Sequence, residues 1–422
     1  MAGFALEGVK VLDLSRVLAG PWCTQILADF GADVLKIEAP GAGDDTRSWG
    51  PPYLTGPDDM PGEKGESGYY LSANRNKRSV AVNLADPRGA DLIRRLAAEA
   101  DIVVENFKLG GLKKYGLDYA SLSAINPRLV YTSITGFGQT GPYADRAGYD
   151  FVAQAMGGLM SITGEKDGPP LKAGVAITDL STGMYAATST LMALRHAERT
   201  GEGQHVDVSL LDTQIAMLAN QALTYLVGGY SPGRLGNAHP TVVPYRLFPT
   251  SDGEIVIAVG NNGQFRQLVA VLGAPEMADD PRYVGNGERV INRDTLEPTL
   301  DALTRTWDGT ELTNALLAKG VPAGPVNSVG DILTDEFAEA RGTVHHFDRG
   351  DGAKVPSVAY PGKLSATPAT FRRMPPRVGE HSRSALAEWL HLSDTELDAL
   401  AEAGVIADRA DLLARTKQGE HA

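Results

Sequence analysis

The first 135 residues alternate between short runs of β-branched and apolar residues and longer stretches in which apolar residues recur with helical spacing. Strands that alternate with helices are typical of a mostly parallel sheet covered by helices on both faces. The runs are apolar almost throughout, as expected of strands whose two faces are both buried. The predicted strands span residues 9–14, 33–37, 79–84, 102–104 and 129–134.

Helix signals fall between these runs. Asp86 and Pro87 form a good helix start, because Asp86 can cap the helix and proline suits its first turn. The residues that follow place one apolar stripe on the helix: Leu92, Ile93, Leu96, Ala97 and Ala100. A long helix is predicted over 179–199, a strand over 205–211 and a helix over 212–227. Together these elements predict an α/β, doubly wound, Rossmann-like large domain.

The length of 422 residues favours more than one domain. Glycine and proline interrupt the pattern from Gly228 to Gly233, which indicates a domain junction. Residues 1–227 are therefore predicted to form the first part of the large domain, and residues 228–330 a smaller α+β domain. Residues 331–422, with helices at 382–390 and 394–403, are predicted to return to the large domain.

Charge and cysteine content exclude some classes of protein. A net charge of -13 argues against a nucleic-acid partner, which would require a basic face. The single cysteine, Cys23, excludes an internal disulfide and fits a reducing compartment; its apolar surroundings predict a small buried side chain. No apolar run approaches the ~20 residues that span a bilayer, and the N-terminus lacks a signal-peptide pattern. A cytoplasmic protein without a membrane partner is expected.

Two familiar motifs are weak here. Residues 136–141 match GxGxxG after a strand, but Pro142 and a polar stretch follow instead of a helix, so a turn is favoured over a dinucleotide site. The eight histidines show no metal-ligand spacing. No metal site is predicted.

The densest positive patch of the first domain is Asn74–Arg78, directly before a strand. Lys113 and Lys114 lie just beyond the strand end at Glu105–Phe107. In open α/β sheets, ligands bind beyond the carboxyl ends of the strands, and cations with amide side chains suit a phosphorylated anion. The alternative is a solvated surface patch, which is the more common fate of a charge run.

Asp179 lies between the apolar run 173–178 and the helix that it is predicted to begin. In structural terms it would be the N-cap of that helix. In functional terms, the helix dipole and free N–H groups would keep its carboxylate ionised, and the same N–H groups could stabilise an oxyanion. The small residues Ser181, Thr182 and Gly183 would leave room for a ligand.

Eight segments, each weak alone, are informative in their order and spacing, which run nearly from end to end of the chain. They are Val17–Pro21, Lys36–Pro40, Asn74–Arg78, Val104–Phe107, Gly136–Pro142, Gly174–Leu180, Gly320–Val326 and Gly379–Ser382. With these segments the chain resembles the class III CoA-transferases, the group of formyl-CoA transferase and carnitine CoA-transferase.

The resemblance implies a two-domain subunit in a homodimer of interlocked rings, with Asp179 as nucleophile. It implies CoA contacts from residues that include the basic patch: Val17, Leu18, Ala19, Asn74, Arg75, Asn76, Lys77, Asn106, Phe107 and Lys114. Asp179 would pass through an aspartyl anhydride and an aspartyl-CoA thioester. An acyl-CoA and a carboxylic acid would be the substrates, and no permanently bound cofactor is implied.

Within the family, the sequence is most similar to the succinyl-CoA:glutarate CoA-transferases, through residues 41–52, 74–77 and 260–262. This similarity implies succinyl-CoA as the donor and a dicarboxylate such as glutarate as the acceptor. The candidates for binding the free carboxylate are Arg47, Arg234 and His239. Formyl-CoA transferase covers its active site with a run of glycines, whereas residues 234–240 here are shorter and different, which argues against a formyl or oxalyl substrate.

Two alternatives remain. The related α-methylacyl-CoA racemases use a histidine and a glutamate for proton transfer, but the matching positions here are Tyr149 and Asn262. Tyrosine and asparagine are poor proton shuttles near pH 7, which argues against a racemase. The other alternative is a CoA-binding protein without turnover, and the presence of Asp179 argues against it.

Overall fold

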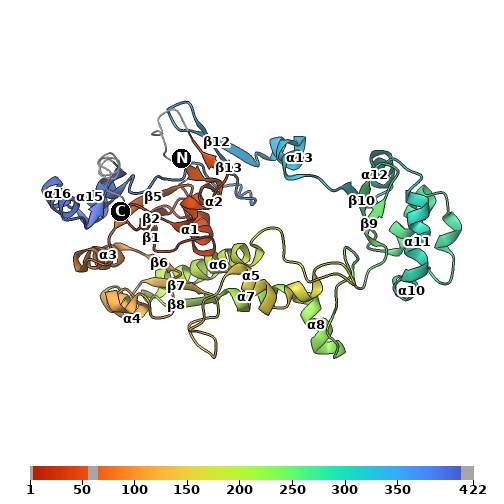
Figure 1. Cartoon of the computed structure of the whole chain (residues 1–422), viewed down its shortest axis with the longest axis horizontal. Helices are drawn as coiled ribbons and strands as arrows, with labels where there is room; N and C mark the ends of the chain where they lie inside the picture. Colours follow the sequence, from red (N-terminus) through yellow and green to blue (C-terminus); the bar gives the residue numbers. More distant parts are fainter. Residues whose placement is uncertain (1–2, 56–64, 410–422) are drawn as a thin grey trace. The chain divides into compact units, whose positions relative to one another are not determined.

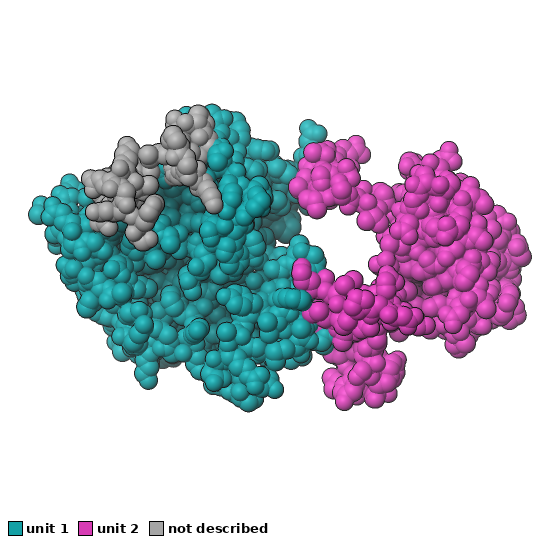
Figure 2. All heavy atoms as spheres, viewed as in Figure 1, with its two compact units in different colours: residues 1–158, 173–219, 338–422 teal, residues 159–172, 220–337 magenta. Residues whose placement is uncertain are grey.

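The computed structural model describes residues 3–55 and 65–409 (Figure 1). The chain divides into two compact units (Figure 2): unit 1 comprises residues 1–158, 173–219 and 338–422, and unit 2 comprises residues 159–172 and 220–337. Compared with the predicted small domain at 228–330, unit 2 begins earlier, ends later and gains a separate segment.

The break between the units has a local cause. A single helix was predicted over 212–227, but the chain forms α7 (Leu210–Met217) and α8 (Ala219–Gly228). Ala219 has a φ of 45°, in the left-handed region that interrupts a right-handed helix. The prediction of one helix was wrong because both halves have helical patterns and nothing in the sequence marks the change at Ala219. The boundary between the units falls at this residue.

Unit 1 is built on a seven-stranded sheet in the order β14-β5-β2-β1-β6-β7-β8; Figure 1 labels the strands from β5 to β8. All neighbours are parallel except β14, which is antiparallel to β5. Taken in chain order, the parallel strands follow the 3-2-1-4-5-6 arrangement of a doubly wound Rossmann sheet. This confirms the predicted α/β class. The strands are β1 (Lys10–Asp13), β2 (Asp33–Glu38), β5 (Lys77–Val82), β6 (Ile102–Glu105), β7 (Val130–Thr135), β8 (His205–Ser209) and β14 (Ile406–Ala407).

Each face of the sheet has its own hydrophobic core, because successive side chains of a strand point to opposite faces. Val11 packs with α1 (Ala19–Asp29) and α6 (Ile177–Thr200), whereas its neighbour Leu12 belongs to the core on the other side. Each such side chain contributes about 1.5–3 kcal/mol through burial. The second core is covered by α3 (Pro87–Glu99), α4 (Tyr119–Ile125), α15 (Ser382–Leu390) and α16 (Asp394–Glu402).

Two local predictions are confirmed. Asp86 is the N-cap of α3 and accepts a hydrogen bond from the N–H of Arg88, with Pro87 in the first turn. Cys23 is fully buried in α1, and burial raises the pKa of its thiol to about 12. It is therefore a packing residue and not a nucleophile.

Unit 2 has its own core under a three-stranded antiparallel sheet in the order β11-β10-β9. None of the helices in the described residues is long and apolar enough to cross a membrane.

The strands of unit 2 are β9 (Tyr245–Pro249), β10 (Glu254–Ala258) and β11 (Ala323–Pro325). Its helices besides α8 are α9 (Asn262–Val271), α10 (Asn286–Ile291), α11 (Arg293–Thr304), α12 (Gly309–Leu317) and α13 (Val329–Thr334), and α14 (Glu336–Arg341) spans the boundary. The remaining elements of unit 1 are β3 (Tyr53–Leu54), β4 (Glu66–Ser67), α2 (Gly68–Ser72), α5 (Asp150–Met156), β12 (Val344–Asp348) and β13 (Lys354–Val358).

Candidate active site

The main cavity of the site lies at the carboxyl ends of β1 and β6. β1 and β6 are neighbours in the sheet, but the next strand of the chain lies on one side for β1 (β2) and on the other side for β6 (β7). The crevice at such a switch point is where doubly wound folds bind ligands. A cavity of about 650 Å³ opens there. Its lining brings together these residues singled out from the sequence: Val17, Leu18, Ala19, Asn106, Phe107, Lys114 and Asp179.

The loop after β1 is held in an unusual conformation. Val17 has a φ of 70°, which costs a β-branched residue roughly 1–3 kcal/mol. Asp44 accepts a hydrogen bond from the Val17 N–H at 3.3 Å. The Asn106 side chain accepts from the Arg16 N–H at 2.9 Å and donates to the Arg16 carbonyl at 2.6 Å. The side chains of Asp44 and Asn106 therefore fix the loop that forms one wall of the cavity.

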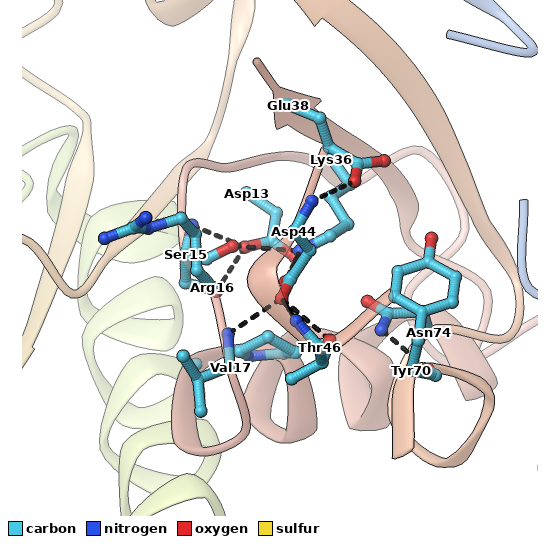
Figure 3. A network of polar contacts seen from close by, with 12 residues as sticks. Asp13, Ser15, Arg16, Val17, Lys36, Glu38, Asp44, Thr46, Tyr70 and Asn74 are labelled. Atoms are coloured by element: carbon cyan, nitrogen blue, oxygen red, sulfur yellow. Dashed lines mark hydrogen bonds and ion pairs between the residues drawn. The ribbon is translucent and has the colours of Figure 1, made fainter. Parts of the chain in front are cut away.

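A buried ion network lies behind this loop and consists of Asp13, Lys36, Asp44 and Lys77. Figure 3 shows Lys36 beside Asp44 and the loop beyond them; the Lys36 Nζ lies 2.8 Å from Asp44 Oδ2 and 2.9 Å from the Ser15 carbonyl oxygen. The Lys77 Nζ lies 3.1 Å from Asp13 Oδ2. Burial alone would raise the pKa of Asp44, but the Lys36 ammonium and local hydrogen bonds lower it to about 2. Each buried charge thus faces an opposite charge.

The Asn74–Arg78 segment is not a solvated patch, so that alternative is wrong. These side chains are buried, and Arg75 donates from Nε to Asp29 Oδ1 at 2.8 Å. Asn74 donates to the Tyr70 carbonyl at 2.8 Å and accepts from the Lys77 ammonium at 2.9 Å. That Asn74, Arg75 and Lys77 contact CoA stays a prediction, and these internal bonds weigh against it.

Of the three candidates for a substrate carboxylate, only Arg47 belongs to unit 1, and it is not among the residues that line this cavity. The Arg47 guanidinium is nearly buried and donates to Glu38 at 2.6 and 2.8 Å and to Glu66 at 2.7 Å. These partners neutralise Arg47 inside the protein; that Arg47 binds substrate stays a prediction, and these contacts weigh against it. Arg234 and His239 belong to unit 2, where Arg234 donates to the Gly168 carbonyl at 2.8 Å and His239 Nδ1 accepts from the Thr241 N–H at 3.2 Å.

Asp179 was predicted to be the N-cap of α6, but it lies in the first turn of that helix instead. The helix begins at Ile177, and the N-cap residue Ala176 has no side chain that could accept a hydrogen bond. The N–H groups of Thr178 and Asp179 instead donate to Asp150 Oδ1, at 2.8 and 3.2 Å. Because these N–H groups are occupied, the prediction that they form an oxyanion hole is not supported.

The carboxylate of Asp179 is electrostatically uncompensated. Burial, with a smaller contribution from the negative charge of Asp150, raises the pKa of Asp179 to about 7. The expectation that the helix terminus keeps this carboxylate ionised is therefore wrong in direction. Within residues 3–55 and 65–409, its oxygens have no recorded hydrogen bond or ion pair. An unpaired carboxylate with a raised pKa in a cavity is a candidate nucleophile or base.

The small residues after Asp179 serve packing and do not leave room for a ligand. Ser181, Thr182 and Gly183 are buried. A Cβ on Gly183 would lie 2.7 Å from the Ala19 carbonyl oxygen. Glycine at this position therefore lets α6 approach α1, which brings Asp179 close to the loop after β1.

Sequence reasoning missed several cations and Asp150. Arg16, Lys108 and Arg146 line the main cavity. A second cavity of about 300 Å³ shares Arg16, Phe107 and Tyr115 with it and extends past β2 and β5. A search for cations within a few residues of each strand end would have found Arg16 and Lys108. No local pattern marks Asp150, which acts on a helix far along the chain.

The GxGxxG segment forms a turn, as predicted. Gly138 and Gly141 have φ values of 89° and 96°, and the next helix, α5, begins only at Asp150. Gly136 instead packs against the backbone of Gly148 at the cavity wall. Across the described ranges, no three histidine, cysteine, aspartate or glutamate side chains form a group able to hold a metal ion.

Comparison with known proteins identifies the family of the chain. Residues 6–382 match the model of the family described as CoA-transferase family III. The chain is similar to the succinate–glutarate CoA-transferase of Agrobacterium fabrum, with 51% identity over 91% of this chain and 95% of the relative. It is also 43% identical to the human succinyl-CoA:glutarate CoA-transferase, over 95% of this chain and 90% of that protein.

A solved structure shows the same similarity in three dimensions. The crystal structure of a CAIB/BAIF family protein from Brucella suis matches with a TM-score of 0.81 and 48% identity. The match covers 92% of this chain and 100% of the Brucella suis chain.

Proposed function

This chain belongs to CoA-transferase family III and is a CoA-transferase, and we propose that it moves CoA from succinyl-CoA to a dicarboxylic acid such as glutarate with Asp179 as nucleophile. The observation that carries the proposal is the Asp179 carboxylate, which is unpaired among the described residues and lines a cavity at the switch point of the sheet. The names of the two relatives described above support the substrates.

The proposed chemistry is a series of acyl exchanges at one carboxylate. An Asp179 oxygen attacks the thioester carbonyl of the donor, the C–S bond breaks, and an anhydride and CoA thiolate result. The thiolate attacks the aspartyl carbonyl of the anhydride, which releases the donor acid and leaves an aspartyl-CoA thioester. The acceptor carboxylate attacks this thioester and gives a new anhydride and thiolate. The thiolate then attacks the acceptor acyl carbonyl, which forms the new acyl-CoA and regenerates Asp179.

The cavity lining suggests how the thioester is held. Val17, Leu18, Ala19 and Phe107 offer apolar surface and backbone groups to the pantetheine arm. Lys114, like the newly found Arg16, offers positive charge to phosphates near the second cavity. Binding at the remote nucleotide end can then position the sulfur against Asp179.

The free carboxylate of a dicarboxylate substrate needs a cation or hydrogen-bond donors. Arg146 lines the main cavity and is a candidate in unit 1. Arg234 and His239, which resemblance to the family suggested, remain candidates from unit 2. Arg47 is the least favoured candidate, because Glu38 and Glu66 already neutralise it.

We further propose that the protein acts as a homodimer of interlocked subunits and requires no resident cofactor. Large apolar side chains on α6 and α8 are exposed in a single chain, which supports an interface with a second copy. They are Met184, Tyr185, Met192, Leu226 and Val227. A cofactor is not needed because each proposed step exchanges one acyl bond for another.

Two assays test the reaction. Succinyl-CoA is offered with glutarate, malate, itaconate and related acids, and the new acyl-CoA is measured by chromatography. In parallel, hydroxylamine added during turnover should convert the acylated side chain to a hydroxamate, which mass spectrometry locates. We expect transfer and an adduct on Asp179 that is absent from Asp179→Asn. Transfer without such an adduct would move the nucleophile elsewhere.

Heavy water distinguishes the alternatives. A racemase would incorporate deuterium at the α-carbon of a 2-methylacyl-CoA without needing an added acid. Tyr149, where the racemases have histidine, lines the cavity but is a poor proton shuttle near neutral pH. We expect no exchange. Exchange without transfer would favour the racemase, whereas CoA binding with neither reaction would favour a non-catalytic binder.

A further inference from the structure

We propose that Asp150 is a positioning residue for the nucleophile: it caps α6 from another helix and thereby keeps the Asp179 carboxylate free of backbone donors. This inference rests on the proposed function of Asp179. Asp150 opens α5, and its carboxylate lies at the first turn of α6.

The geometry begins with a helix that lacks its own cap. The first-turn N–H groups of a helix have no partners within the helix, and Ala176 cannot supply one. Asp150 Oδ1 accepts from the N–H groups of Thr178 and Asp179, which are 28 and 29 residues further along the chain. The remaining N–H groups of the turn, those of Ile177 and Leu180, donate to backbone carbonyls.

The second oxygen of Asp150 is also held in place. Gln154 donates from Nε2 to Asp150 Oδ2 at 2.5 Å, and its Oε1 accepts from the Ala173 N–H at 2.9 Å. Gln154 is fully buried. Asp150 therefore has contacts at both oxygens, and one of them ties it to the segment that leads into α6.

This arrangement leaves the two carboxylates with different roles. A carboxylate that accepts backbone N–H bonds is stabilised in its charged form and is a weaker nucleophile. Asp150 takes those bonds, and its charge adds to the burial that raises the pKa of Asp179. Acylation of Asp179 removes its negative charge and so relieves the repulsion from Asp150. The covalent intermediate is thereby favoured relative to the free enzyme.

Other charged and titratable groups face the same space. Tyr69, on α2, has its pKa raised to about 12 by burial and by the charges of Asp179 and Asp150, so it stays neutral. Arg16 and Lys114 also line the cavity. They are common to all the variants compared below, so a change at Asp150 alone isolates its contribution.

The decisive variant is Asp150→Asn, which keeps Oδ1 as an acceptor and removes the charge. The acidic limb of the kcat/KM profile should move to lower pH by about one unit or more, the size expected when a like charge is removed. At pH 8 the rate should fall several-fold because a less basic carboxylate is a weaker nucleophile, so the two profiles should cross. The KM for succinyl-CoA should change less than kcat.

The matched control is Gln154→Leu, which removes the bond to Asp150 Oδ2 but leaves the charge and the cap. Its acidic limb should stay at the wild-type position even where its melting temperature falls. Asp150→Glu, which retains the charge, should likewise keep the wild-type limb. If Asp150→Asn does not fold, Asp150→Ser supplies a smaller uncharged acceptor for the same measurement.

The outcomes separate this inference from the proposed function. Wild-type enzyme without transfer to any acid, or an active Asp179→Asn variant, refutes the proposed function. Where wild type transfers CoA and Asp179→Asn does not, an unshifted limb in the uncharged Asp150 variant overturns the role of Asp150. An equal shift in Gln154→Leu also overturns it, because packing and not charge would then be the cause.

Discussion

The carboxylates on the two sides of the cavity have opposite electrostatic environments. Behind the loop after β1, Asp13 and Asp44 are buried with Lys77 and Lys36, and the pKa of both carboxylates is lowered. At the start of α6, Asp179 is next to another carboxylate instead, and its pKa rises to about 7. Burial raises the pKa on both sides, so the nearby charge decides the direction. The comparison separates a carboxylate that builds the wall from one that can react.

The two sides also differ in what they cost. A buried ion network is held together only while every charge has its partner, and it fixes Val17 through Asp44. The α6 side tolerates a destabilising pair of carboxylates, as expected of a functional site. Loss of a charge should therefore act on stability on the first side and on catalysis on the second.

The largest effect is expected from Asp179→Asn. Removal of a covalent nucleophile should lower kcat by about 10⁴-fold or more. Stability should be unchanged or slightly higher, because the side chain has no recorded partner in the described residues and the repulsion from Asp150 is gone. Steady-state transfer rates and urea unfolding of the same preparation test both halves. Substantial residual transfer would remove the distinction between the two sides.

On the other side, Lys36→Met should act on folding. It leaves Asp44 and Asp13 buried without one of their cations, and such a loss costs about 3–5 kcal/mol. The melting temperature should fall, and the remaining folded enzyme should have a higher KM for acyl-CoA because Val17 is less well fixed. Differential scanning fluorimetry and initial rates measure the two effects.

The control for Lys36→Met is Lys354→Met, which breaks an exposed ion pair with Asp348. An exposed pair contributes about 0–1 kcal/mol, so this variant should melt close to wild type. If the two lysine variants lose similar stability, the buried network is not what holds the wall.

The strands of the large sheet and the start of α3 could be predicted because each is marked by residues within one short stretch of sequence. The strands around Val11, Val34 and Val103 have apolar side chains on both faces, which is a pattern that a single stretch of chain displays by itself. Asp86 and Pro87 likewise mark the start of α3 without outside information. Resemblance to the family drew attention to Asp179, and its position in the cavity agrees with the proposed role.

The remainder depended on contacts between distant segments. The charges of Asn74–Arg78 appear as an exposed run in sequence, because Asp13 and Asp29, which neutralise Lys77 and Arg75, lie far along the chain. Asp150 caps α6, a helix that begins only at Ile177, so no capping pattern adjoins either element in the sequence. The raised pKa of Asp179 follows mainly from its burial in the folded chain and to a smaller extent from Asp150, and neither cause is visible in the local sequence.

The pH dependence of stability should show the two sides as opposite slopes. The lowered pKa of Asp44 gives stability that is complete above its unfolded value of 3.8 and is lost as the pH falls towards about 2. Asp179 acts the other way: between pH 3.8 and about 7 the folded state holds a proton that the unfolded state releases, so stability declines as pH rises. This decline is at most a few kcal/mol, since one pKa unit is worth about 1.4 kcal/mol.

Urea unfolding at intervals from pH 5 to pH 8 tests that slope. Asp179→Asn should remove the part of the decline that Asp179 causes, so the variant should gain on wild type as pH rises. Parallel curves for the two proteins would mean that Asp179 titrates with an ordinary pKa and that its environment is not uncompensated.

The smallest expected effect concerns the contact that joins the two sides, where α6 crosses α1. Gly183→Ala places a Cβ 2.7 Å from the Ala19 carbonyl oxygen and 3.0 Å from the Trp22 side chain, and backbone cannot yield cheaply. Overpacking of this kind costs about 1–3 kcal/mol, from which roughly 1 kcal/mol of helix propensity is recovered. Because Ala19 lines the cavity, KM should rise while the acidic limb of the pH profile stays in place. Gly287→Ala is the matched control, a helical glycine with open space around it, and should be neutral or slightly stabilising. If the two variants have the same stability and the same KM, then α6 and α1 can move apart without cost. In that case Gly183 does not fix the position of Asp179 relative to the loop after β1.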